Sequence, residues 1–239
     1  MRLLIWPFRQ RHARAPIAGG QLGHAVRGYG PGEEVQPYKG SHGFAGWYYS
    51  STMRDHVGYE SWLERDPLIP LDRDPDVVAI ASQPFWLYWR DGTRRRRYAP
   101  DYFVRLSDGG ARIVDVRAAD ELDEATEEAF DATGQACRTV GWEFERAGRP
   151  EPLFMANARW LSRYRRAHCG RPVPVAARLV EVFREPMRLW DGAGLVGERL
   201  QVLPALFHLL WSGALKADLV GGLMETDSLV WTEGNTWAA

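Results

Sequence analysis

The sequence predicts an α/β protein that ends in a small, mainly helical module. Short apolar stretches rich in aromatic and β-branched residues fill residues 44–117, which is typical of strands, and an apolar stripe at helical spacing follows them. Clusters of glycine, proline and aspartate separate these stretches, as expected for turns. With 239 residues, of which 45% are hydrophobic, the chain can form one large or two small globular domains.

The first elements are an arm, a strand and a short helix. Residues 1–43 are predicted to form an irregular arm, because glycine and proline interrupt any regular period. The aromatic stretch GFAGWYYSST predicts a strand that reaches about Thr52. In HVGYESWLERD the apolar residues recur at helical spacing before Pro67, which predicts a short helix.

Strands and two longer helices complete the first domain, for which we expect residues 44–167. The segment DPDVVAIASQPFWLYWRDG predicts two strands closed by an Asp91-Gly92 turn, and YAPDYFVRLSDGGARIVDVR predicts a hairpin. The apolar stripe between Leu122 and Val140 predicts a helix, and GWEFER a further strand. An amphipathic helix is expected over residues 153–166, so the order of elements is that of an α/β core.

The remaining residues predict a linker and a second module. HCGRPVP, residues 168–174, reads as a linker. Helices near residues 175–183 and in LPALFHLLW, followed by strands in ALKADL and SLVWT, predict a winged-helix-like module over residues 175–239. Beyond Arg199 its single basic residue, Lys216, faces four acidic ones, Asp218, Glu225, Asp227 and Glu233. We therefore expect this module to dock on protein rather than on DNA.

Composition narrows the class of protein. The net charge is −1, so any affinity for nucleic acid must come from a local basic patch. Lys39 and Lys216 are the only lysines, so an arginine at a functional position can reflect this bias. Cys137 and Cys169 lack the spacing of a zinc site or a disulfide framework. With no signal peptide and no stretch able to span a membrane, the sequence predicts a cytoplasmic location.

The predicted hairpin brings two aspartates together. A turn centred near Asp108 sets Asp101 opposite Asp115, and directly opposed residues share one face of a sheet. Arg117 lies two residues after Asp115 and therefore points to the same side. A register shifted by one residue would separate the three side chains.

Opposed carboxylates indicate a metal site. Like charges opposite one another are unfavourable, and Asp115 lies in the apolar run RIVDV, where a lone carboxylate is costly. A divalent cation removes both penalties, and oxygen ligands suit Mg²⁺, with Mn²⁺ as a substitute. Glu60, on the predicted short helix, is a candidate third carboxylate. In the alternative interpretation Asp101 caps a turn and Asp115 pairs with an arginine.

Four consecutive arginines precede the hairpin. Arg94, Arg95, Arg96 and Arg97 lead into Asp101 and could hold DNA phosphates beside it. A solvated charged surface is the alternative. The aromatic residues Trp86, Tyr88 and Trp89 are expected to pack in the core and on the sheet rather than stack on bases.

The segments GYESWLERD, DPDVVAIASQPFWLYW, RRYAPDYFVRL and IVDVR, in this order and spacing, resemble the TnsA family of transposon-end endonucleases. The resemblance covers residues 37–166 approximately, and the PALFHLLWSGALKADL tail is also similar to actinobacterial members. It implies a restriction-endonuclease-like core of the PD-(D/E)xK superfamily, in which a mixed sheet is flanked by helices. It also implies Glu60, Asp101 and Asp115 as metal ligands, with a contribution from the Val116 backbone.

The departure from that family pattern is Arg117, where most of the superfamily has lysine. Arginine stays charged and suits bidentate phosphate contact, but it cannot share a proton. The resemblance implies a magnesium-dependent subunit of a heteromeric cut-and-paste transposase that nicks the 5′ ends of the transposon. Its partners would be double-stranded DNA, a DDE-type (TnsB-like) recombinase and an AAA+ (TnsC-like) ATPase. The alternatives are an inactive assembly or DNA-positioning subunit and a stand-alone restriction or repair nuclease.

Overall fold

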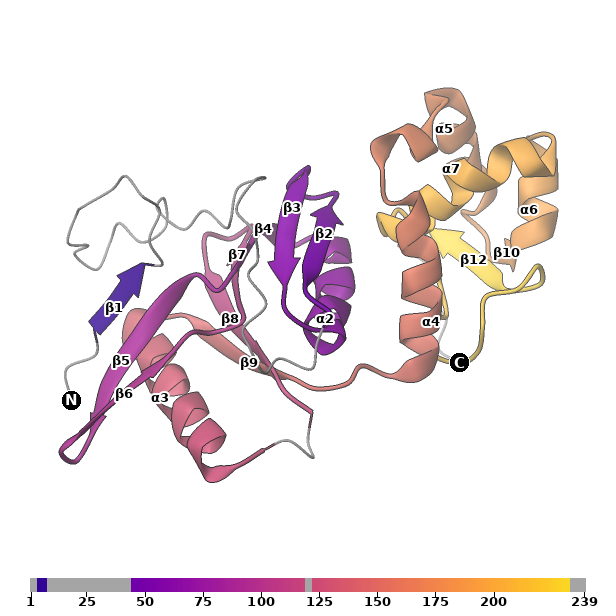
Figure 1. Ribbon diagram of the computed structural model, residues 1–239. Coiled ribbons are helices and arrows are strands. Elements are labelled where there is room, and N and C mark those ends of the chain that lie inside the picture. Colours follow the sequence, from indigo (N-terminus) through magenta and orange to yellow (C-terminus); the bar gives the residue numbers. More distant parts are fainter. Residues whose placement is uncertain (1–3, 8–43, 119–121, 233–239) are drawn as a thin grey trace. The chain divides into compact units, whose positions relative to one another are not determined.

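A mixed four-stranded sheet in the order β4-β7-β8-β9 forms the centre of the N-terminal part (Figure 1). The computed structural model describes residues 4–7, 44–118 and 122–232. Antiparallel pairing joins β4 (Val77–Ser82), β7 (Tyr102–Leu106) and β8 (Ala111–Val116), and β9 (Glu143–Ala147) is parallel to β8. Parallel neighbours need a crossover, and helix α3 (Glu124–Val140) lies in it.

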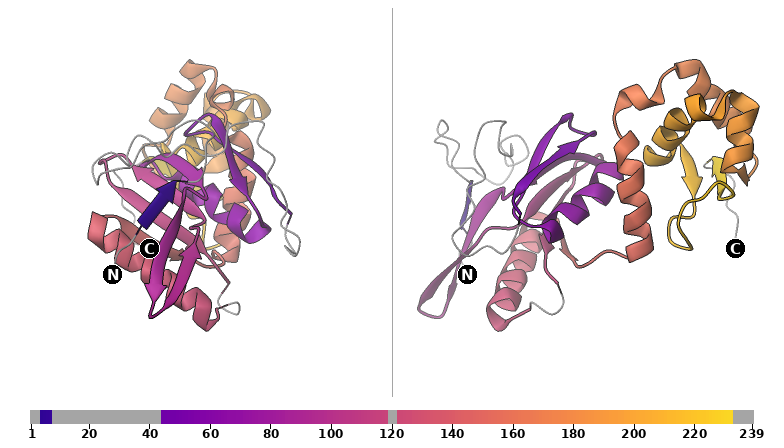
Figure 2. Two further views of the ribbon diagram at one scale, coloured as in Figure 1. Left: turned by 60° about the vertical axis from the view of Figure 1, so that its left-hand side comes forward. Right: turned by 45° about the vertical axis from the view of Figure 1, so that its right-hand side comes forward.

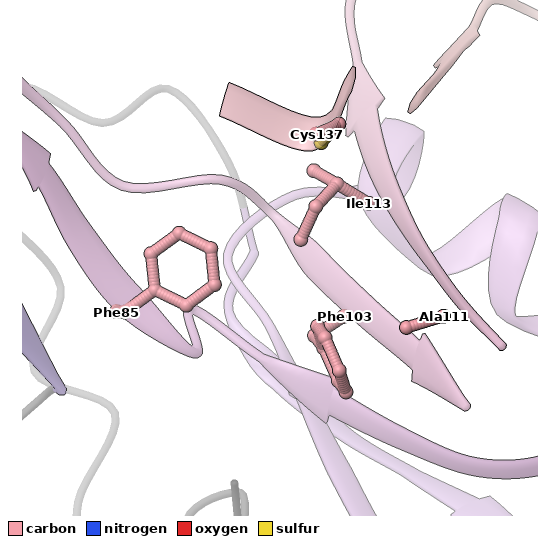
Figure 3. Close-up of a cluster of buried hydrophobic side chains, with 5 residues drawn as sticks. All are labelled: Phe85, Phe103, Ala111, Ile113 and Cys137. Atoms are coloured by element: carbon pink, nitrogen blue, oxygen red, sulfur yellow. The ribbon is translucent and has the colours of Figure 1, made fainter. Parts of the chain in front are cut away.

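Helices cover both faces of this sheet. Phe103 and Ile113 pack against Cys137 of α3 in one apolar cluster (Figure 3). Tyr102, which precedes Phe103 on β7, points to the other face. There its hydroxyl donates to the Glu64 carbonyl of α2 (Trp62–Arg73) at 3.2 Å. The predicted α/β class is therefore confirmed: a mixed sheet is flanked by helices, as in a restriction-endonuclease-like core.

A second sheet, in the order β1-β5-β6, lies beside α3 (Figure 2). It consists of β1 (Leu4–Pro7), β5 (Phe85–Asp91) and β6 (Arg94–Tyr98). Leu87 and Trp89 pack on the alanines of α3, so the expected packing role of Trp89 is confirmed. Residues 4–7 differ from the predicted irregular arm because their backbone pairs with β5. Residues 8–43 of that arm lie outside the described residues.

The short helix predicted within HVGYESWLERD is wrong in its position. Residues 55–59 form β3 (Asp55–Tyr59), which pairs with β2 (Gly46–Ser50). Helix α2 starts later because Ser61 caps it by accepting a hydrogen bond from the Glu64 amide. The helix then continues through Pro67, where the sequence predicted its end, because the residues around that proline are buried against the sheet and the hairpin.

The chain divides into two compact units, residues 1–149 and 150–239. The second contains α4 (Pro152–Leu161), short 3₁₀ turns at 162–164 and 167–170, α5 (Val173–Val182), β10 (Met187–Arg188), α6 (Leu189–Val196), α7 (Arg199–Trp211), β11 (Leu215–Ala217) and β12 (Leu229–Thr232). The predicted linker, residues 168–174, lies inside this unit. From α5 onward the elements along the chain are helix, strand, helix, helix, strand and strand, and the strands pair in the order β10-β12-β11. The winged-helix-like assignment stays a prediction.

None of the helices within residues 44–118 and 122–232 is both long and apolar enough to cross a bilayer.

Candidate functional site

Asp101 and Asp115 meet at the end of the β7–β8 pair, as the predicted register requires. Tyr102 pairs with Val114, so Asp101 stands opposite Asp115. The Asp101 amide donates to Asp115 Oδ1 at 3.1 Å, and the Val116 amide donates to Asp101 Oδ2 at 2.7 Å. Backbone donors of each strand therefore hold the carboxylate of the other, which fixes both side chains before any ligand binds.

Arg117 lies directly beside the two aspartates. Its Nη1 is 3.9 Å from Asp101 Oδ2 and donates to the Val116 carbonyl at 2.9 Å. The side chain of Arg117 is one third exposed, whereas that of Asp101 is 11% exposed. The partly exposed Arg117 thus lies beside two buried carboxylates, and the Val116 backbone bonds both Asp101 and Arg117. A role of Val116 in metal binding stays a prediction.

Burial makes both carboxylates hard to ionise. It raises the pKa of Asp101 well above the usual value, and the charges of Asp115 and Glu64 raise it further, although Arg117 acts in the opposite direction. Burial likewise raises the pKa of Asp115 to about 6, against the lowering effect of the Asp101 amide. For Arg117, burial lowers the pKa, but the neighbouring carboxylates outweigh it and raise it overall. A second positive charge near the pair would be favourable.

Tyr98, at the end of β6, is a neighbour that the sequence did not indicate. Burial, and then the charges of Asp115 and Asp101, raise the pKa of its hydroxyl, so it remains a proton donor. It lies near enough to lower the pKa of Asp115. Neither Tyr98 Oη nor Asp115 Oδ2 has a hydrogen bond of ordinary geometry with the described residues, although both atoms are buried.

Glu60 forms no metal-binding group with the aspartate pair among the described residues. It is exposed and precedes α2, rather than lying on a helix as predicted, and its amide donates to Glu64 Oε2 at 2.8 Å. Glu64 is the acid of α2 whose charge acts on Asp101, and burial raises its own pKa. The spacing Ser61-x-x-Glu64, a capping box, was the sequence signal for a helix beginning there. The metal-binding role of Glu60 stays a prediction.

The chemistry of the pair suits a hard divalent cation. Within the described residues no group of three or more His, Cys, Asp or Glu side chains is arranged to hold a metal ion. Magnesium, however, is commonly held by one or two carboxylates, with water and substrate phosphate filling the other positions. Among the described residues Asp115 Oδ2 is buried without a hydrogen bond of ordinary geometry, which is costly for a carboxylate unless a cation faces it. Asp101 and Asp115 therefore fit such an ion without a third carboxylate.

The four arginines of β6 divide between two faces of the strand. Arg96 lies on the α3 side, opposite Trp89, and pairs with Glu128 of α3 at 3.2 Å. Arg95 and Arg97 point the other way and are exposed, and the Arg97 guanidinium lies 4.8 Å from the ring centre of half-buried Trp86. The predicted role of Arg94 to Arg97 in DNA binding stays a prediction, which this geometry narrows to Arg95 and Arg97.

Arg146 of β9 is a further neighbour that local sequence spacing could not reveal. The parallel pairing of β8 with β9 sets it beside Asp115, whose pKa it helps to lower. Such a contact depends on a crossover that contains a whole helix, so no short motif encodes it.

Comparison with known proteins gives one family. Residues 74–146 match a family model described as TnsA-like endonuclease N terminal. This range contains Asp101, Asp115, Arg117 and Arg146, and it begins after Glu60 and Glu64. A search of curated proteins gave no significant match.

Proposed function

Residues 74–146 belong to the TnsA-like endonuclease N-terminal family, and from this we propose that the chain is the metal-dependent DNA endonuclease subunit of a heteromeric cut-and-paste transposase. It hydrolyses phosphodiester bonds at the 5′ ends of the transposon. The observation that supports this most directly is the pair Asp101 and Asp115, held by reciprocal backbone hydrogen bonds beside Arg117. A nuclease of the transposase type needs such a site.

The two aspartates would hold magnesium, with manganese as a substitute. When bound, the ion lowers the pKa of a coordinated water and offsets charge on the phosphate. Asp101 and Asp115 supply oxygen ligands whose positions are already fixed, so little ordering remains to be done on binding. Water attacks phosphorus in line with the leaving oxygen.

Arg117 supports the reaction by its charge. It is permanently protonated, so it cannot act as a general base, but its donors can bind an oxygen of the pentacovalent transition state. Its exposed third allows contact with DNA while its Nη1 remains bonded to the Val116 carbonyl. Replacement of lysine by arginine is thus compatible with an active nuclease.

The partners follow from the proposed role. Double-stranded DNA at the transposon ends is the substrate, and Arg95 and Arg97 are the best placed of the four β6 arginines to meet its phosphates. A DDE-type (TnsB-like) recombinase would cut and join the other strand, and an AAA+ (TnsC-like) ATPase would regulate both. Beyond Arg199 the second unit has a net negative sequence, which favours protein docking there.

Cleavage of a transposon-end duplex tests the proposal. The full chain is incubated with magnesium, with and without the proposed recombinase partner, and nicks are mapped on each strand. We expect magnesium-dependent nicks at the 5′ ends that Asp115→Ala and Asp101→Ala abolish. Cleavage without the recombinase at unrelated sites would support a stand-alone nuclease instead. No cleavage under any condition, with DNA binding retained, would support an inactive positioning subunit.

A further inference from the structure

A pocket of about 600 Å³ is lined by Asp115 and Arg117 and by residues 146–149 at the end of β9. Its described lining includes three arginines, Arg117, Arg146 and Arg149, against a single carboxylate, and Leu122 and Phe130 supply apolar surface. A volume of this size accommodates a nucleotide-sized group. The lining favours an anionic ligand with an apolar portion.

The strand pairing sets the arginines side by side at the site. Asp115 pairs with Arg146 and Val116 with Ala147, and the Arg117 amide donates to the Ala147 carbonyl at 3.1 Å. Neighbouring strands lie about 4.8 Å apart, and arginine side chains reach farther than this spacing. Cations on adjacent strands can therefore contact two neighbouring anionic groups.

Arg146 is held in place but not covered. Its guanidinium stacks over Phe130 at 4.5 Å from the ring centre, and its Nη2 donates to Glu127 Oε1 at 2.5 Å. The side chain is 44% exposed, so part of the planar donor group faces solvent. A guanidinium carries five donors, of which this bond to Glu127 uses one. Arg149, at the end of the unit, is exposed as well.

We propose that this pocket binds the DNA phosphate adjacent to the one that is cleaved, with Arg146 and Arg149 as its ligands. The inference rests on the proposed nuclease function and extends its site by one nucleotide. Arg117 then contacts the scissile phosphate, and Arg146 and Arg149 hold the neighbouring phosphate. Contacts to two successive phosphates fix the orientation of the scissile P–O bond, which a single contact cannot do.

Two small probes distinguish a site that binds one phosphate from a site that binds two. Deoxythymidine 3′,5′-bisphosphate carries two phosphates on one nucleoside, whereas deoxythymidine 5′-monophosphate carries one. Binding of each to the full chain is measured by titration calorimetry in the presence of calcium. Because charged hydrogen bonds are strong, we expect the bisphosphate to bind at least about tenfold more tightly than the monophosphate. Arg146→Gln/Arg149→Gln should remove this preference, so that the two probes bind with affinities within about twofold of each other.

The control is Arg112→Gln. Arg112 also lies on β8 and pairs with Glu143 and Glu145 of β9, but it points to the opposite face of the sheet. This variant should keep the wild-type preference. The single variant Arg149→Gln changes an exposed side chain, so it tests the pocket without disturbing the packing of Arg146 on Phe130; it should show a smaller loss.

Equal binding of the two probes to the wild type would overturn the inference, and so would a preference that survives in the double variant. The same preparations are assayed for magnesium-dependent cleavage. A wild type that shows the preference but never cleaves would contradict the proposed function and leave the second phosphate site in place. A wild type that cleaves but shows no preference would support the proposed function and overturn the second phosphate site.

Discussion

At the scale of single residues, the buried aspartate pair lowers the stability of the metal-free fold while it supplies the proposed metal ligands. Asp115 is fully buried, and its pKa rises from an ordinary 3.8 to about 6. The native state therefore binds a proton more tightly than the unfolded chain. Between about pH 4 and pH 6 the native state holds more protons, so the free energy of unfolding falls as pH rises through this window. Asp101 acts with the same sign.

Asp115→Asn should stabilise the metal-free protein at neutral pH while abolishing cleavage. One pKa unit corresponds to about 1.4 kcal/mol, so removal of the buried charge should add roughly 1–3 kcal/mol to the free energy of unfolding. The amide can still accept the hydrogen bond from the Asp101 backbone. Urea denaturation in EDTA at pH 5 and pH 8 measures this difference. A variant less stable than wild type at pH 8 would mean that the charged form is favoured in the fold.

Arg117→Lys should keep substantial cleavage, because lysine also supplies a positive charge at this position. Arg117→Ala should lose roughly 100- to 1,000-fold in rate, the cost of removing one charged stabiliser of the transition state. Manganese titration should show that both variants still bind metal, since Asp101 and Asp115 are held by backbone amides rather than by Arg117. Cleavage restored by lysine in an inactive wild type would identify a disabled nuclease. Full activity of the alanine variant would make Arg117 structural.

The sequence could predict the site residues that depend on one hairpin. The turn at Asp108 determines the register, and the register places Asp101 opposite Asp115. It could not predict Arg146, whose neighbours arise from parallel pairing across a helix. Glu60 was predicted to lie on the helix because the apolar residues around it have helical spacing. Ser61 is the N-cap, however, so the helix begins at Trp62 and Glu60 precedes it. Local geometry was predictable, and contacts across a crossover were not.

At the scale of elements, Asp72 joins the end of α2 to the β2–β3 hairpin. This buried carboxylate accepts hydrogen bonds from the Tyr48 and Ser50 hydroxyls and from the amides of Ser51 and Thr52. Asp72→Ala leaves these donors without a partner, so we expect a loss of roughly 2–4 kcal/mol in the free energy of unfolding. Urea denaturation measures it. The exposed Asp55→Ala, in the same hairpin, should change stability by less than about 0.5 kcal/mol. Similar losses in both variants would deny Asp72 this role.

The side chains of β6 alternate between two faces of the strand, and this leads to a second prediction at this scale. Arg95→Gln/Arg97→Gln should weaken binding to a mixed-sequence duplex and reduce the slope of log affinity against log salt by about 1 for each lost phosphate contact. Arg96→Gln is the control, because Arg96 pairs with Glu128 on the other face. Fluorescence anisotropy at several salt concentrations gives both slopes. If the control loses as much slope as the double variant, net charge rather than the strand face determines binding.

At the scale of the whole molecule, the boundary between the units follows packing rather than composition. The Gly/Pro-rich segment HCGRPVP was predicted to be the linker, but the boundary lies earlier, at Arg149 and Pro150 within RAGRPEP. Helix α4 lies between them and belongs to the second unit, because Trp160 packs edge-on against Phe207 of α7 at 4.3 Å. Asn157, also buried on α4, donates to the carbonyls of Leu219 and Gly222. Sequence composition indicated a break at HCGRPVP but could not show that α4, which precedes it, packs on the second unit.

This boundary fixes the fragments for the last prediction. Residues 1–149 contain the aspartate pair, the β6 arginines and the pocket arginines, whereas the ten basic residues of the range 150–239 are nearly matched in number by nine acidic ones. A fragment of residues 1–149 should therefore bind duplex DNA with the salt slope of the full chain, and residues 150–239 should bind weakly. A cut at residue 170 is unsuitable, because it removes α7 from the face of α4 that it covers. Anisotropy titrations of both fragments give the comparison. Most of the affinity in residues 150–239 would assign DNA recognition to the second unit and exclude docking on protein as its sole role.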